Sequence, residues 1–408
     1  MKSITMLTIF ERIQNFNRDL LLDKVAIKYK LISENVFGFF RGTNHIFYED
    51  LNKEVFPTSP QCWICGDLHL ENFGTFKGDN RLVYFDLNDF DESILAPVGW
   101  EIVRVITSIF IAFDSLKITD KEALNSAKLF LKTYCQIIAE GKPRYIESKI
   151  ATGIVKRFLN KVENRSDKKL FESRTKEKKG SLKLSGDKKR QLLIDNKLKK
   201  QLIENFKPWM ESNNAPPNNY KVLDVRFRLA GTGSLGVNRY VFLIEKDTDK
   251  NKHMLIDMKQ ATASSLLPYV KTTTQPLWKS EADRMVTIQK MMQNIPPAQL
   301  STMEFEGDSY IMQEMQPTKD RINFKLIQSL FKEACTVIKD MALITASAHL
   351  RTVGRKGSCS ADELMNFGKE EIWQQQLLDY SLKYKDKMFD YYKEFKEDLK
   401  MDKFIGNG

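Results

Sequence analysis

The spacing of hydrophobic and polar positions divides the chain into a helical stretch, a strand-rich stretch and a second helical stretch. The first 55 residues have the apolar spacing of helices. Residues 98–114, VGWEIVRVITSIFIAFD, are almost wholly apolar with a few charges, which predicts a helix buried in the core. A short apolar run lies at 61–65, and RLVYFD at 81–86 predicts a strand. Helices are then expected to predominate to about residue 210.

The pattern changes after SNNAPPNNYK (212–221), whose Asn and Pro residues are typical of a linker. Beyond it the chain is expected to form three strands, a helix, a hairpin with Gly-Asp at its turn, and a helical tail. These elements are predicted at 222–231, 237–246, 253–261, 279–293, 304–315 and from Phe324 onward.

We therefore predict an α+β fold with three segments. Residues 1–215 would form a helical lobe, residues 216–320 a smaller antiparallel β-rich lobe, and residues 321–408 helices that complete the helical lobe.

The composition is that of an ordinary globular protein, with 42% hydrophobic and 29% charged residues in 408. No apolar run approaches the roughly 20 residues of a membrane span, and the opening MKSITMLTIFERIQNF lacks the small-residue cleavage site of a secretory signal. Five cysteines do not suggest a disulfide framework, so we expect a reducing, cytoplasmic location. Cys62 and Cys65 form a C-x-x-C without a second ligand pair, which favours packing over a redox or zinc role.

The net charge of +11 comes largely from a Lys/Arg-rich stretch between about 142 and 207. Such a stretch could attract nucleic acid or an acidic membrane surface. No aromatic residues interleave the run KEKKGSLKLSGDKKR (176–190), as a stacking platform for single strands would require. A solvated helical face and loop is the favoured interpretation, with at most a weak acidic partner.

The chemistry is concentrated in residues 65–91, CGDLHLENFGTFKGDNRLVYFDLNDFD. Asp67 and Asn72 have the D-x-x-x-x-N spacing of a phosphoryl-transfer loop, with Asp67 as base and Asn72 as magnesium ligand. A turn and a strand then lead to Asp86, which the spacing favours as the second metal ligand. Asp89 and Asp91 are chemically suitable as well, so the choice among the three stays open.

The second half of the predicted nucleotide site lies downstream. GTGSLG (231–236) supplies Gly231, Gly233 and Gly236 in a G-x-G-x-x-G pattern between two strands, as expected for a hairpin folded over phosphates. Lys259 on the third strand can reach the phosphates, and Glu281 on the next helix can pair with it. Glu314 lies in YIMQEMQP, where backbone groups could hold adenine.

Other polar residues have more ordinary interpretations. His69 is expected to stabilise its loop, and His349 to pack between helices. Arg41 is either a phosphate or substrate contact or a structural Arg paired with an Asp. A Walker A loop is absent, and four histidines are too few for a dimetal phosphoesterase.

With these residues assembled, the chain resembles the bacterial family known as domain of unknown function 2252. That family is grouped with kinase-like folds such as aminoglycoside and choline phosphotransferases, whose loop reads roughly H-G-D-x-H-x-x-N. Cys65 stands where those enzymes carry the first His. The matching motifs are FFRGT (39–43), GDLHLENFG (66–74), FDLNDFDE (85–92), GTGSLG with DMKQA, EMQPTKDR (314–321) and AHLRT (348–352).

The resemblance implies a two-lobed, protein-kinase-like fold. The Asp67 loop precedes the glycine loop and Lys259, the reverse of the usual order, which together with the resemblance suggests a circular permutation. We expect a phosphotransferase that uses ATP and Mg²⁺ on a small hydroxylated acceptor. A nucleotidyl transferase that binds ATP reversed, a nucleotide-binding pseudokinase and, less favoured, a nucleic-acid-binding protein stay open.

Overall fold

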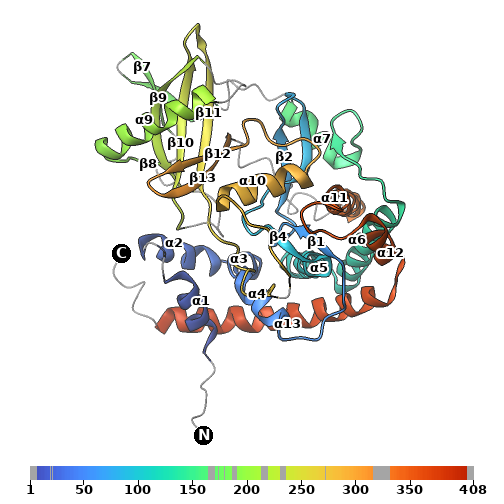
Figure 1. Cartoon of the computed structure of the whole chain (residues 1–408). Coiled ribbons are helices and arrows are strands. Elements are labelled where there is room, and N and C mark those ends of the chain that lie inside the picture. The colour runs from blue at the N-terminus through green and yellow to red at the C-terminus, as the bar shows by residue number, and fades with distance from the viewer. Residues whose placement is uncertain are drawn as a thin grey trace.

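A computed structural model shows how these segments are arranged (Figure 1). Gly231 and Gly233 of the glycine loop, most of the 212–221 linker, and residues 316–321 of EMQPTKDR lie outside the described residues. The structure describes residues 7–18, 20, 22–163, 171–172, 174–178, 180–185, 191–212, 219–229, 236–271, 273–315 and 331–401.

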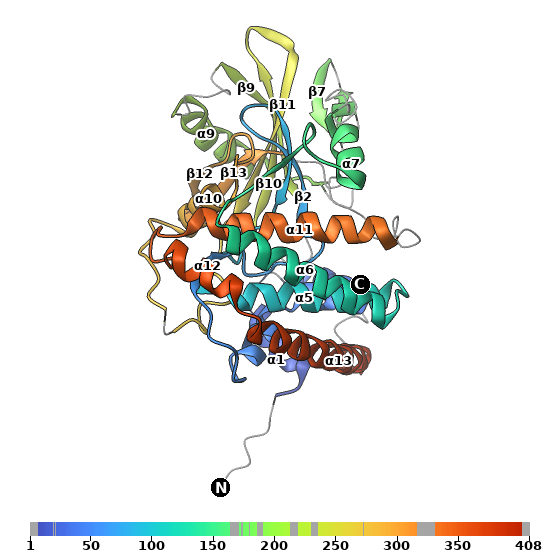
Figure 2. The same cartoon turned by 90° about the vertical axis from the view of Figure 1, so that its right-hand side faces the viewer.

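One half of the molecule is helical, as the hydrophobic pattern predicts. Its centre is α5 (Val98–Ser115), which is buried along nearly its whole length. Helices α6 (Asp120–Glu140) and α13 (Ile372–Met401) pack against α5 from the two sides, and α11 (Phe331–Thr352) packs on α6 (Figure 2). The remaining helices of this half are α1 (Ile9–Asn17), α2 (Leu22–Ile32), α3 (Val36–Gly42), α4 (Asn44–Leu51), α7 (Gly153–Glu163) and α12 (Ala361–Lys369).

Two small antiparallel sheets hold the loops of the helical half. Strand β1 (Gln61–Ile64) pairs with β4 (Ile94–Pro97), so the chain leaves and re-enters this ladder around the whole segment 65–93. Strands β2 (Phe73–Lys77) and β3 (Val83–Leu87) form a hairpin within that segment. β5 (Ile146–Glu147) adds to the hairpin's edge.

The other half is built on a six-stranded antiparallel sheet with the order β12-β13-β11-β10-β9-β8. The predicted three strands and the hairpin are confirmed. α10 (Glu281–Met292) lies between this sheet and the helical half in Figure 1. The strands are β8 (Gln191–Leu192), β9 (Tyr220–Arg228), β10 (Arg239–Lys246), β11 (Asp249–Gln260), β12 (Ser301–Phe305) and β13 (Asp308–Glu314).

The β-rich half begins earlier in the chain than the expected boundary at residue 216. Helix α9 (Asn196–Ser212) covers one face of the sheet, where the ring of Phe206 stacks on Phe242 with centroids 4.1 Å apart. Trp209 donates from its indole nitrogen to Ser301 Oγ at 3.0 Å. A basic hairpin of β6 (Thr175–Lys178) and β7 (Ser181–Leu184) also packs on this half, because Leu184 is buried against the opposite face of the sheet.

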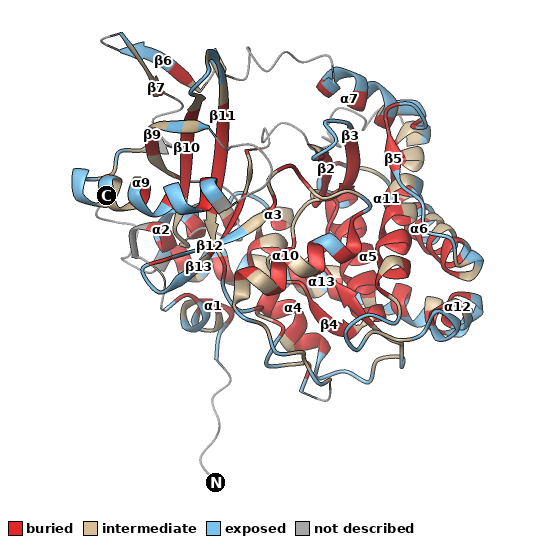
Figure 3. Ribbon diagram, turned by 45° about the horizontal axis from the view of Figure 1, so that its top comes forward, coloured by how far each residue is buried: buried red, intermediate tan, exposed pale blue. Residues whose placement is uncertain are grey.

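Each half has buried positions of its own (Figure 3), and α10 of the β-rich half also contributes Ile288, Met291 and Met292 to the core of the helical half. The large apolar core of the helical half combines residues from the first four helices, α5, α6 and the C-terminal helices, so segments from both ends of the chain complete it. Smaller clusters lie on the two faces of the six-stranded sheet. Within the described residues, no helix is both long and apolar enough to cross a membrane.

Candidate active site

Asp67 lies in the loop after β1, and its carboxylate is held by an arginine from the core. Arg104 of α5 donates to Asp67 Oδ1 from Nη2 at 2.7 Å and from Nε at 3.2 Å. The guanidinium is fully buried and lies over the ring of Phe40, with its central carbon 3.6 Å from the ring centroid. Burial raises the pKa of Asp67 to about 7, although Arg104 opposes the shift. A carboxylate with such a pKa is suited to accept a proton near neutral pH.

A second buried charge, Glu101 of α5, binds the backbone of the same loop. Glu101 Oε1 accepts from the amides of Cys65 at 2.6 Å and Gly66 at 3.1 Å. Its other oxygen lies 2.7 Å from His349 Nε2, and His349 Nδ1 lies 2.9 Å from the hydroxyl of Tyr134. These side chains come from α5, α6 and α11 and are completely buried, so the core of the helical half fixes the position of Asp67.

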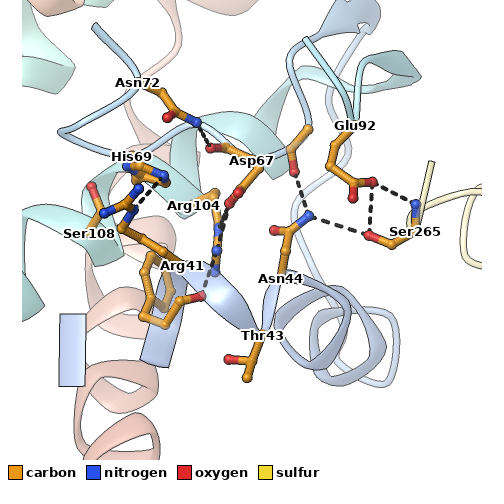
Figure 4. A network of polar contacts seen from close by, with 12 residues as sticks. Arg41, Thr43, Asn44, Asp67, His69, Asn72, Glu92, Arg104, Ser108 and Ser265 are labelled. Carbon is orange, nitrogen blue, oxygen red and sulfur yellow. Dashed lines mark hydrogen bonds and ion pairs between the residues drawn. The ribbon is translucent and has the colours of Figure 1, made fainter. Parts of the chain in front are cut away.

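Gly66 brings the Asp67 loop against the loop of the acidic cluster. Its φ is +79°, and a Cβ built there would lie 2.3 Å from the carbonyl oxygen of Glu92, so a side chain is excluded. Asn44 Nδ2 donates to the Gly66 carbonyl at 3.2 Å, and Glu92 accepts from the amide and hydroxyl of Ser265 (Figure 4). Segments of both halves therefore meet beside Asp67.

Asn72 contacts the backbone of Asp67, in agreement with their spacing, and Asp86 is held by backbone amides. Asn72 Nδ2 donates to the carbonyl oxygen of Asp67 at 2.6 Å. Asp86 is buried within β3, where its carboxylate accepts from the Leu87 amide at 2.8 Å and from the backbone of Asn294. Burial raises the pKa of Asp86 to about 6, partly offset by Arg351. These backbone contacts fix the Asp86 carboxylate, and its part in metal binding stays a prediction.

Asp91 makes one of the contacts that join the two halves. Its carboxylate forms an ion pair with the ammonium group of Lys259 on β11, 168 residues away. Arg284 of α10 donates to the carbonyl oxygens of Asp91 and Thr262 at 3.0 Å each, and also to Ser93. Asp89 lies within electrostatic reach of both Asp67 and Asp91, because its charge raises the pKa of each. Asp91 is therefore the carboxylate of the acidic loop that contacts Lys259.

The expected Lys259–Glu281 pair is not formed. Glu281 accepts from Arg284 Nε at 2.6 Å, and no ion pair among the described residues joins it to Lys259. Glu281 and Arg284 are three positions apart on α10, a spacing at which side chains on a helix are neighbours. Arg284 is buried and Glu281 is half-exposed, so Arg284 is the α10 side chain that reaches the site.

The strand that carries Lys259 has further charges on the same face. Asp257 lies two residues before Lys259 and forms ion pairs with Arg228 of β9 and Arg239 of β10. Arg239 is directly opposite Lys259 in the ladder. Although burial opposes it, the two guanidinium groups hold the pKa of Asp257 well below its usual range, and burial lowers the pKa of Arg228 to about 10. Three cations and one carboxylate thus cluster at the end of the sheet nearest Asp91.

The glycine loop and Glu314 are placed as follows. β9 and β10 pair as antiparallel neighbours, so GTGSLG connects two strands of a hairpin. Of its three glycines Gly236 is described, and its φ of +116° is one that residues with side chains rarely adopt.

Glu314, at the end of β13, pairs with Arg81 from the turn of the β2–β3 hairpin at 2.5 Å.

Arg41 and His69 form a contact beside the Asp67 loop. Arg41 donates to Glu71 at 2.5 Å from Nη1, and its Nε lies 3.1 Å from His69 Nε2. Arg41 is therefore paired with a Glu in place of the expected Asp. His69 also contacts the Glu71 amide through Nδ1 at 3.1 Å, in agreement with the loop-stabilising role predicted for it.

Two decisive residues, Glu101 and Arg104, were not singled out from the sequence. The signal was present, because both are charges within the otherwise apolar stretch 98–114. Charged side chains are almost never fully buried without a partner. A charge on a core helix therefore points to a polar group that the core must hold, although the sequence does not say which one.

The arrangement of the acidic side chains shows what kind of metal site they could form. Within the described residues, no group of three or more His, Cys, Asp or Glu side chains is arranged to hold a metal ion. Magnesium at nucleotide sites uses one or two carboxylates together with phosphates and water, which is a smaller requirement. Asp89, Asp91 and Asn72 offer oxygen ligands of that kind.

The chain belongs to the family described as "Uncharacterized protein conserved in bacteria (DUF2252)", whose sequence profile matches residues 20–398. Neither the curated proteins nor the solved structures contain a significant match.

Proposed function

We propose that this protein is a phosphotransferase that uses ATP and Mg²⁺ to phosphorylate a small hydroxylated acceptor. The observation that carries the proposal is the Lys259–Asp91 ion pair, since it brings the strand-borne lysine to the acidic loop that lies against Asp67. Phosphoryl transfer depends on positioning and charge stabilisation more than on covalent chemistry. A lysine, a pair of carboxylates and a proton acceptor in one place are the parts it needs.

Each residue has a role that its surroundings favour. Lys259 would bind the phosphates, and Asp89 and Asp91 with Asn72 would hold magnesium, which neutralises phosphate charge. Asp67 would accept the proton of the acceptor hydroxyl, for which its pKa near 7 is favourable. Arg104 keeps the Asp67 carboxylate aimed in one direction.

The order of elements supports a permuted, kinase-like arrangement. In protein kinases a glycine-rich hairpin comes first, followed by a strand with the lysine and a helix. Here β9, the glycine turn, β10, Lys259 on β11 and α10 follow that order, but they come after the Asp67 loop. The permutation rests on this order and on the packing of residues 331–401 with the first helices.

Nucleotidyl transfer is a second candidate, and the charged face of the sheet favours it. Arg228 and Arg239 lie on the same face as Lys259 and add positive charge beside it, and both are paired with Asp257. A nucleotide that bound in reverse would place its terminal phosphates against this cluster and its α-phosphate toward Asp67. Phosphates are well matched to guanidinium groups.

Two labelled forms of ATP distinguish these functions. The full chain is incubated with Mg²⁺, a panel of hydroxylated metabolites, and ATP labelled at either the α- or the γ-phosphate. Transfer of the γ-label supports the phosphotransferase, whereas transfer of the α-label overturns it in favour of the nucleotidyl transferase. Binding of ATP without transfer of either label would favour a pseudokinase, and no ATP binding would contradict all three.

A further inference from the structure

Two cysteines from distant parts of the chain lie in contact beside β1. The Sγ atoms of Cys62 and Cys359 are 3.4 Å apart, although 297 positions separate the residues. A disulfide needs about 2.05 Å between its sulfurs, so an approach of roughly 1.4 Å would close the bond. We propose that Cys62 and Cys359 form a redox modification site, at which a small disulfide of the glutathione type converts the thiol pair to a cystine.

The backbone already holds the pair together in the reduced state. The amide of Cys359 donates to the carbonyl oxygen of Gln61 at 2.8 Å, next to Cys62 in β1. Trp63 donates from its indole nitrogen to the carbonyl oxygen of Arg355 at 3.0 Å. The loop after α11 therefore lies along β1, and bond formation requires little rearrangement of either segment.

The two sulfurs differ in their access to an oxidant. Cys62 is completely buried, whereas Cys359 is half-buried in a loop whose residues 354–357 are exposed. The hydrogen bond with Cys62 lowers the pKa of Cys359, which favours the Cys359 thiolate. Cys359 is thus the thiol that meets the oxidant first, and Cys62 the one that resolves the intermediate.

The chemistry balances with glutathione disulfide as the oxidant. The Cys359 thiolate attacks one glutathione sulfur, forms a mixed disulfide and releases one glutathione thiolate. The Cys62 thiolate then attacks the Cys359 sulfur and releases the second glutathione. The two protein thiols lose two protons and two electrons, and one glutathione disulfide becomes two glutathione molecules.

The bond would clamp the strand that leads into the candidate active site. β1 continues through Cys65 and Gly66 to Asp67, and the Cys359 loop follows α11, which carries His349. A crosslink that closes so long a loop restricts the unfolded chain, so it stabilises the folded state. This effect does not depend on the proposed phosphotransferase activity.

Peptide mapping of the oxidised native protein tests the site. The reduced full chain is treated with glutathione disulfide under native conditions, its remaining thiols are alkylated, and it is digested with trypsin without reduction. We expect residues 54–77 and 357–369 as one linked peptide. Its mass should be two hydrogen atoms below the sum of peptide 54–77 alkylated at Cys65 and peptide 357–369 with a free thiol. Because 54–77 contains both Cys62 and Cys65, the link must be lost in Cys62→Ser and Cys359→Ser but retained in Cys65→Ser and in the control Cys135→Ser.

A linked peptide that persists in Cys62→Ser, or a native wild-type chain that stays fully reduced, would overturn the proposal. Thermal unfolding gives a second measurement. The oxidised wild-type protein is expected to melt about 5 °C or more above the reduced form, and dithiothreitol should reverse the shift. Cys359→Ser changes a partly exposed residue and should show no shift; an equal rise in that variant would also contradict the site.

Discussion

The loops at Asp67 and at Asp91 lie side by side, but they are held in opposite ways. The Asp67 loop is fixed by Glu101 and Arg104, both on α5 in the core of the helical half. The Asp91 loop is tied by Lys259 and Arg284, which belong to the β-rich half. Asp67, the proposed proton acceptor, is therefore positioned by one folding core, whereas the proposed phosphate and metal end lies where the two halves meet.

This difference predicts separable defects. Changes behind Asp67 should affect stability and turnover, whereas changes at Lys259 should affect nucleotide binding. Variants at both loops, and the dependence of turnover on pH, test whether the two defects can be separated.

Asp67→Asn should lower turnover about a thousandfold, because the amide cannot accept the proton of the acceptor. Nucleotide affinity should stay close to that of the wild type. Initial rates with the acceptor found in the labelling experiment measure the first effect, and calorimetry measures the second. Asp114→Asn, at an exposed position near the end of the same α5, is the control. Unchanged turnover in Asp67→Asn would remove Asp67 as the base.

Glu101→Ala should lower the free energy of unfolding by about 3 kcal/mol or more, since it leaves two loop amides and His349 without their buried partner. Chemical denaturation measures the loss. Glu101→Gln keeps an acceptor oxygen for the amides of Cys65 and Gly66 and should retain most of the stability. Equal losses in both variants would mean that the charge, and not the hydrogen bonding, holds the loop.

Lys259→Ala should weaken ATP binding roughly tenfold, the loss expected for one charge-assisted contact. Its effect on unfolding should be smaller than that of Glu101→Ala, because both side chains of the Lys259–Asp91 pair are partly exposed. The matched control is Lys252→Ala on the same strand, whose side chain is 65% exposed. If the two variants bind ATP equally well, the β-rich half does not form the phosphate site.

Turnover should depend on pH through Asp67. Its pKa is raised to about 7 by burial, and the base must be unprotonated, so the rate should fall tenfold for each pH unit below about 7. The folded state binds this proton more tightly than the unfolded chain does. Protonation of Asp67 therefore contributes fully to the free energy of unfolding below about pH 4, and this contribution is lost as the pH rises through 7. An acid limb near pH 4 would show that Asp67 is not the titrating group.

Glu281→Gln should change ATP affinity by less than about twofold, because its partner is Arg284 and half-exposed ion pairs contribute little. This variant tests whether Glu281 pairs with Arg284, as in the structure, or with Lys259. A tenfold loss would mean that Glu281 pairs with Lys259 when nucleotide binds, which is the pair that the sequence predicted.

Local patterns predicted much of the fold. The strands and α10 were expected at nearly their observed positions, because apolar periodicity is encoded over short distances. The predicted start of the β-rich half, residue 216, lies after α9. An amphipathic pattern shows that a helix has an apolar face, but it does not show which surface that face covers. Its contact between Phe206 and Phe242 spans two segments.

Side-chain partners were harder to predict than elements. The Asp67–Asn72 spacing predicted their proximity correctly, because five residues of one loop cannot separate far. The partner of Lys259 was mistaken for Glu281, since the pair with Asp91 joins positions 168 residues apart. Asp86 was favoured by spacing as the metal ligand; its carboxylate accepts from the Leu87 amide, and its part in metal binding stays a prediction.

The most direct test of the single shared site is a crystal structure with Mg²⁺ and a non-hydrolysable ATP analogue. The account predicts phosphates in contact with Lys259, the metal on Asp89 or Asp91, and the γ-phosphate toward Asp67. An α-phosphate toward Asp67 would replace phosphoryl by nucleotidyl transfer. A nucleotide bound away from Lys259 and Asp91 would contradict the central claim.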